Sequence, residues 1–149
     1  MPSMDPVVVR SIVTDDDLPS APIDPSWIHG GSPAARSRAL VFPTGATLSA
    51  TIWESNAGEF DWHYPVDELI QILAGEVEIR PATGPAYTLG PGDMVFFPGG
   101  QVVRWHVREY VKKVAINGVR LSLARRIAHR LPFAVQIVHR VRAIRGGGR

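Results

Sequence analysis

Three polar residues in the middle of the chain have side chains and a spacing that suit chemistry. Asp61 and His63 are two residues apart, so on a regular strand both side chains point to the same face. Glu68 comes one turn later, where the next strand-like run begins. Where two carboxylates and an imidazole converge, they form a mixed oxygen and nitrogen donor set that suits Mn²⁺, Fe²⁺, Zn²⁺ or Ni²⁺. The spacing therefore indicates a candidate divalent metal site.

The same residues also allow a site without a metal. A buried Glu68 beside His63 can do general acid–base chemistry, because burial raises a carboxyl pKa toward neutrality. Apolar walls with a few polar groups are typical of a small-molecule pocket. A structural interpretation stays open beside it, in which the aromatic residues fill a core and Glu68 pairs with Arg104. The candidate pocket residues are Trp53, Trp62, Tyr64, Phe97, Val103 and Trp105.

Short β-rich runs separated by turn residues must position these side chains. The chain has 14 Gly and 13 Pro in 149 residues, which favours many turns and short strands. A turn at Gly75-Glu76 predicts a hairpin, since Gly tolerates a positive φ. Strand runs at this spacing predict an all-β sandwich or barrel. The predicted strands are 39–42, 47–53, 59–64, 67–73, 76–80, 86–89, 94–97, 102–107 and 111–116.

Two motifs in this region resemble those of a known superfamily. The run from Glu68 to Gly75 reads E-x6-G, and the run from Gly92 to Gly100 reads G-x5-P-x-G. In this order they resemble the cupin superfamily, and within it the small cupins related to ureidoglycine aminohydrolase and the ethanolamine-utilisation cupin. The resemblance covers roughly residues 40–117 and continues through Trp105, Glu109 and Lys112-Lys113. It implies a cupin double-stranded β-helix, which is a jelly-roll barrel.

The resemblance also implies roles for individual residues. Metal-binding cupins carry H-x-H-x3,4-E in the first motif and a further His after the second. In this chain Glu68 stands at the glutamate position, His63 at the second histidine, Asp61 at the first and Val103 at the last. The resemblance thus implies nitrogen or amine metabolism with a divalent metal. His106 is not included, because strand alternation turns it away from the face of Val103.

Two classes of function follow from this sequence. The first is a cupin that acts on or binds a small molecule in the barrel lumen; as an enzyme it would be a metal-assisted hydrolase, aminohydrolase-like, or an oxidoreductase. The second is a non-catalytic, metal-free cupin that binds a ligand, senses it or supports an assembly. An open jelly roll has strand edges to protect, so a homodimer is expected.

The composition and charge of the chain together divide it into three segments. We expect an N-terminal arm over 1–37, the barrel over 38–118 and a basic tail over 119–149. Residues 1–118 hold 14 acidic and eight basic residues, a charge of −6, whereas the tail holds eight Arg and no acidic residue. Helical spacing of its apolar residues predicts that the tail is partly α-helical and amphipathic.

Three partners suit the predicted tail: the barrel or a second subunit, an anionic membrane surface, or nucleic acid. The acidic body and the lack of a DNA-binding motif disfavour nucleic acid. The chain has no cysteine and starts without the pattern of a signal peptide, so a cytoplasmic protein is expected.

Overall fold

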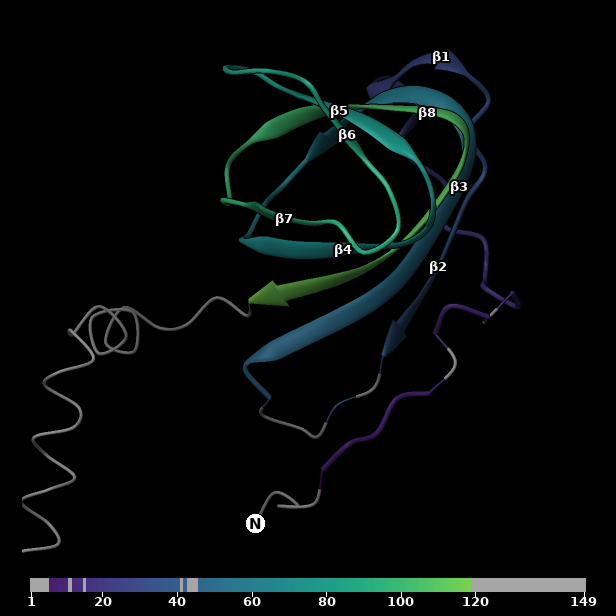
Figure 1. Cartoon of the computed structure of the whole chain (residues 1–149), viewed down its shortest axis with the longest axis vertical. Coiled ribbons are helices and arrows are strands. Elements are labelled where there is room, and N and C mark those ends of the chain that lie inside the picture. The colour runs from purple at the N-terminus through teal and green to yellow at the C-terminus, as the bar shows by residue number, and fades with distance from the viewer. Residues whose placement is uncertain (1–5, 11, 15, 41, 43–45, 119–149) are drawn as a thin grey trace, which may run out of the picture. The chain divides into compact units, whose positions relative to one another are not determined.

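The computed structural model describes residues 6–10, 12–14, 16–40, 42 and 46–118, and these residues are almost entirely strands and connections (Figure 1). The predicted helices of the tail at 119–149 lie outside the described residues. The described elements are the 3-10 helix η1 (Pro25–Trp27) and the strands β1 (Ile28–Gly31), β2 (Ala35–Leu40), β3 (Leu48–His63), β4 (Glu68–Gly75), β5 (Val77–Pro81), β6 (Tyr87–Leu89), β7 (Met94–Phe97) and β8 (Val102–Gly118).

The two longest strands, β3 and β8, form the backbone of the sheet. They pair antiparallel from Leu48 opposite Gly118 to His63 opposite Val102, and Figure 1 shows them curving side by side. On its other edge β8 pairs first with β5 and then with β4. β7 extends the sheet beyond β4, β6 pairs with β5, and β1 and β2 pair with β3. This confirms the predicted all-β jelly-roll architecture.

Two pairs of predicted strands are in fact single bent strands. Runs 47–53 and 59–64 join in β3, and runs 102–107 and 111–116 join in β8. The polar and Gly residues between them look like turns in the sequence, but they form a bulge, where the β3–β8 register shifts between Asn56 and Gly58. Gly58 packs against Pro33: a Cβ added at Gly58 would lie 2.7 Å from the Pro33 Cβ, so a larger residue would force this contact to shift.

The hairpin predicted at Gly75-Glu76 is wrong. β4 and β5 do not pair with each other; both pair antiparallel with β8, one after the other. Gly75 has the expected positive φ, +74°, but it forms a corner between β4 and β5, which pair one after the other with the same edge of β8. The corner is held by the N–H of Glu76, which donates to the carbonyl of Tyr110 at 3.0 Å.

The sheet begins inside the segment that the sequence assigned to the N-terminal arm. β1 and the first half of β2 lie before residue 38, and both strands pair with β3. The apolar runs of that segment are short and interrupted by Gly, Pro and Ser, which hides them from a search for strand periodicity. Further toward the N-terminus, Leu18 and Ile23 are buried.

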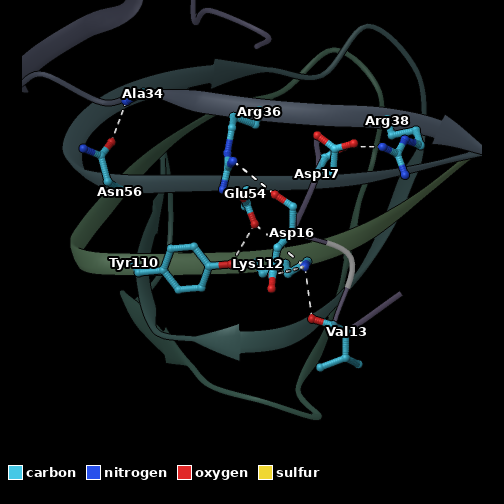
Figure 2. Close-up of polar contacts among 10 residues, drawn as sticks. All are labelled: Val13, Asp16, Asp17, Ala34, Arg36, Arg38, Glu54, Asn56, Tyr110 and Lys112. Atoms are coloured by element: carbon cyan, nitrogen blue, oxygen red, sulfur yellow. Dashed lines mark hydrogen bonds and ion pairs between the residues drawn. The ribbon is translucent and has the colours of Figure 1, made fainter. Parts of the chain in front are cut away.

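Val13 and Asp16 contact the sheet through a polar group that we call the outer cluster, formed by Arg36, Glu54, Tyr110 and Lys112 (Figure 2). Glu54 is buried, pairs with Arg36 and accepts a hydrogen bond from the Tyr110 hydroxyl at 2.8 Å. The Lys112 ammonium lies 3.8 Å from Glu54 and donates to the carbonyl of Val13 at 3.0 Å. The outer cluster thus attaches the N-terminal segment to β3 and β8.

The core is rich in aromatic side chains. It combines stacked and edge-on rings with β-branched residues of β4, β5 and β8. Within the described residues no helix is long and apolar enough to cross a membrane.

We expect Gly75→Ala to destabilise the fold by about 2–4 kcal/mol, because Ala disfavours the positive φ and its Cβ would lie 2.1 Å from the Tyr110 carbonyl oxygen. Gly84→Ala is the matched control: Gly84 also has a positive φ, but the space around it is open. Urea unfolding followed by circular dichroism measures both. Equal losses in the two variants would show that the corner contact contributes nothing.

Candidate functional site

A cavity of about 280 Å³, partly open to solvent, lies against the inner face of β2, β3 and β8. Its lining combines two indole rings with polar side chains, and Ala21 and Pro22 of the N-terminal segment also line it. This volume suits a small metabolite rather than a large cofactor, which needs a larger pocket. The lining residues are Ala21, Pro22, Ser37, Thr51, Trp53, Trp62, Glu68, Lys113, Ala115 and Asn117.

The Lys113 ammonium is the central charged group of the cavity. Its side chain is 3% exposed, and its Nζ donates to Oε1 of Glu68 at 3.1 Å. Three indole rings surround the same nitrogen, with centroids 4.7 Å (Trp105), 5.2 Å (Trp53) and 5.3 Å (Trp62) away. A cation over an indole face is attracted by the ring quadrupole, so the cage and the carboxylate together compensate a buried charge.

Burial nevertheless changes the acid–base chemistry of this group. Desolvation lowers the pKa of Lys113 below its ordinary value, and the charge and hydrogen bond of Glu68 oppose that shift. Burial shifts the pKa of the neighbouring Tyr64 in the opposite direction, because its phenol is charged only after losing a proton. Burial, with a smaller contribution from the Glu68 charge, raises the pKa of this phenol. Tyr64 therefore stays a neutral hydroxyl, and it accepts a hydrogen bond from the Trp105 indole at 3.1 Å.

Asn117 supplies an unpartnered polar atom to the same cavity. Its Oδ1 is buried, and within the described part of the chain it has no hydrogen-bond partner. An unsatisfied buried acceptor costs about 1–3 kcal/mol, so native structures rarely leave one without a role. Asn117 sits on β8 two alternations beyond Lys113, and both line the cavity.

The structure does not bring Asp61, His63 and Glu68 together. Asp61 accepts two hydrogen bonds from Arg104, at 2.8 and 3.1 Å, and lies 2.7 Å from His29 Nε2. His63 is exposed and stacks on Trp27, with ring centroids 4.4 Å apart. The expected pair of Glu68 with Arg104 does not form either, since Arg104 binds Asp61.

The register shift between β3 and β8 explains this placement. Before it the cavity-facing residues of β3 have odd numbers, Thr51 and Trp53. After it the inward residues are even, Phe60 and Trp62, because the register has shifted by one. Asp61, and His63 with it, therefore falls on the outer face.

The predicted pocket residues divide into two groups. Trp53 and Trp62 line the cavity as expected. The other four belong to the buried core behind it, where Tyr64 stacks on Phe97 at 4.3 Å. Trp105 contributes indirectly, because its ring lies under the Lys113 ammonium. The core residues are Tyr64, Phe97, Val103 and Trp105.

Comparison with known proteins identifies the fold. Residues 44–115 match the family model of the EutQ-like cupin domain. The chain belongs to the cupin superfamily. None of the curated proteins compared with it matches.

Solved cupin structures resemble this one. A putative ethanolamine utilization protein Q from Salmonella typhimurium has 23% identity and a TM-score of 0.51, covering 57% of this chain and 69% of its own. The EutQ protein of Clostridium difficile has 21% identity and a TM-score of 0.52, over 58% and 64%. A DUF861 protein of unknown function from Pseudomonas syringae has 31% identity and a TM-score of 0.59, over 66% and 42%. This cupin thus spans less than half of the last protein and about two thirds of the EutQ proteins.

The metal pattern of cupins does not fit the residues of this one. When three residues separate the second histidine position from Glu68, the two histidine positions hold Trp62 and Tyr64, both on the inner face. The position of the further histidine, after the second motif, holds Val103. Among the described lining residues Glu68 is the one carboxylate, and it is paired with the Lys113 ammonium. Within the described residues no group of three or more His, Cys, Asp or Glu could hold a metal ion.

Sequence reasoning missed Lys113 and Asn117, although a signal was present. Both share odd numbering with Val103 and Trp105, which the sequence placed in the lumen, and β8 keeps this alternation through the bulge. Extending the period-2 pattern to residue 117 would have predicted an inward lysine.

We expect Lys113→Met and Glu68→Gln each to destabilise the cupin by about 3–5 kcal/mol, because each leaves a buried partner unpaired. The double variant should be more stable, by about 1–3 kcal/mol, than the sum of the two single losses of unfolding free energy predicts. Urea unfolding measures the cycle. A parallel cycle of Lys112→Met with Glu68→Gln should be additive, since Lys112 lies in the outer cluster; additivity in both cycles would contradict the pairing.

The ionisation of Asp61 makes the stability of this cupin depend on pH. Arg104, and more weakly His29, lowers the pKa of Asp61 from 3.8 to about 2 against a smaller effect of burial. Because the folded-state pKa is depressed, its stabilisation is complete above pH 4 and is lost as the pH falls toward 2. Asp61→Asn should therefore cost about 1–2 kcal/mol at pH 6 after allowance for solvent screening. The difference between variant and wild type should shrink between pH 4 and 2 in urea titrations; a constant difference would refute this assignment.

Proposed function

We propose that this EutQ-like cupin binds a small polar organic molecule in the cavity, with Lys113, Glu68 and Asn117 as its recognition groups. The observation that carries the proposal is the convergence of these three groups on one cavity walled by tryptophan. Apolar walls with a few placed polar groups are the usual composition of a small-molecule site. The proposal requires no divalent metal, because Lys113 supplies the cation beside Glu68.

The charges and hydrogen-bonding groups restrict the ligand. Lys113 and Glu68 neutralise each other, so the cavity has little net charge to attract a multiply charged ion. Asn117 Oδ1 has no donor among the residues that the structure describes, and Ser37 and Thr51 line the same space. A compact molecule with both a donor and an acceptor satisfies these groups.

The test is a ligand-observed NMR screen of the full chain with small amides, hydroxy acids and carbonyl compounds of about ten heavy atoms or fewer. Bound fragments should lose about tenfold or more in affinity in Ala115→Leu, which fills the cavity, and in Asn117→Leu, which removes the acceptor.

Lys112→Met is the control, because it changes a buried lysine on the opposite face and should leave the affinity unchanged. Fragments that bind Ala115→Leu as well as wild type would place binding elsewhere and overturn the proposal. A screen without any fragment bound would overturn it too.

A further inference from the structure

The primary amine of Lys113 is a chemically distinctive group in this cavity. It belongs to one of only two lysines in the chain, Lys112 and Lys113, against 14 arginines. A guanidinium stays protonated in proteins, whereas a buried lysine amine can lose its proton and act as a nucleophile. The cation that faces the cavity is thus one of the few in this chain that can be converted to a neutral amine.

We propose that Lys113 forms an imine with the carbonyl carbon of a small aldehyde or ketone bound in the cavity. This inference rests on the proposed function, since the carbonyl compound must first enter the same cavity. Three features carry it: the Nζ lies on the cavity wall, a carboxylate lies 3.1 Å from it, and the indole cage holds it in place.

Glu68 is placed to carry the protons. In the neutral form of the pair, Glu68 holds the proton that Lys113 has lost. The Nζ lone pair attacks the carbonyl carbon, a C–N bond forms, and the π electrons move to the oxygen, which takes the proton of Glu68. Nζ then returns a proton to Glu68, giving a neutral carbinolamine. Glu68 protonates the hydroxyl of the carbinolamine, the C–O bond breaks, and water leaves as the C=N bond forms. The balance is one carbonyl plus one amine giving one imine and one water, without an oxidant or reductant.

The surroundings of Lys113 favour both the starting amine and the product of this reaction. Burial lowers the pKa of Lys113, which increases the share of the neutral, reactive amine. The product is a protonated imine, a cation at the same place as the former ammonium. It retains the carboxylate of Glu68 and the faces of Trp53, Trp62 and Trp105, so the compensation of the buried charge persists.

Lys112 provides a matched comparison inside the same strand. It is as buried as Lys113, but it points to the opposite face, where it contacts Glu54 and the carbonyl of Val13 (Figure 2). It does not line the cavity. A reaction that depends on the cavity should therefore distinguish two adjacent lysines that general reactivity would treat alike.

The experiment traps the imine on the full chain. Protein is incubated with propanal or acetone and sodium cyanoborohydride, and the reduced adducts are located by peptide mass spectrometry. We expect the Lys113 adduct to exceed that of Lys112 by about tenfold or more. Lys112→Met should retain the adduct, and Lys113→Arg should lose it. The comparison of the two lysines within wild type needs no variant, so it stands even where Lys113→Arg fails to fold.

The outcomes separate this inference from the proposed function. Fragments that bind in the cavity by the NMR criterion, together with adducts only on Lys112 or the terminal amine, would overturn the imine and leave the binding site intact. Absence of both cavity binding and a Lys113 adduct would overturn both. An adduct on Lys113 that Ala115→Leu suppresses would support both, because that variant fills the cavity without touching the amine.

Discussion

The pairing of β8 along both of its edges is the constraint on which the rest of the structure depends. On one side it bonds to β3 over its whole length, and on the other to β5 and then to β4. Its inward residues keep odd numbers along the whole strand, from Val103 to Asn117, so neighbouring residues point to opposite faces. Consecutive residues Lys112 and Lys113 are thereby committed to opposite environments, the outer cluster and the cavity. Both lysines are buried with a carboxylate nearby, Glu54 for one and Glu68 for the other.

Glu68 links this cupin to its superfamily and also shows where it departs from the metal-binding pattern. The carboxylate keeps its place at the start of β4, and a neighbouring strand provides the positive charge as an ammonium. Around it, Trp62 and Tyr64 stand where imidazoles would coordinate. Indole faces stabilise an ammonium well and offer no lone pair to a transition metal. The described residues thus leave Glu68 paired with an ammonium and include no group of three or more His, Cys, Asp or Glu that could hold a metal.

The architecture could be predicted from local patterns, because strand runs and turn residues report on backbone preferences. The site could not, because it depends on long-range register. Asp61 and His63 have correct spacing for a shared face, yet the bulge after Asn56 decides which face that is. Gly75 correctly signalled a positive φ, but the choice between a hairpin and a corner belongs to β8, which pairs with both neighbours. Lys113 could have been found by alternation alone, since β8 passes the bulge without losing its parity.

The tryptophans described above have an optical consequence. The chain has four of them, and they form one connected group, Trp27 to Trp62 to Trp53 to Trp105, with neighbouring ring centroids 5.6–6.0 Å apart. Rings this close exchange excitation energy, so the ultraviolet emission of the whole protein comes from a single neighbourhood. That neighbourhood includes the wall of the cavity and the surroundings of the Lys113 charge. The intrinsic fluorescence of this cupin is therefore a local signal, sensitive to whatever neutralises, displaces or quenches within a few ångströms of one amine.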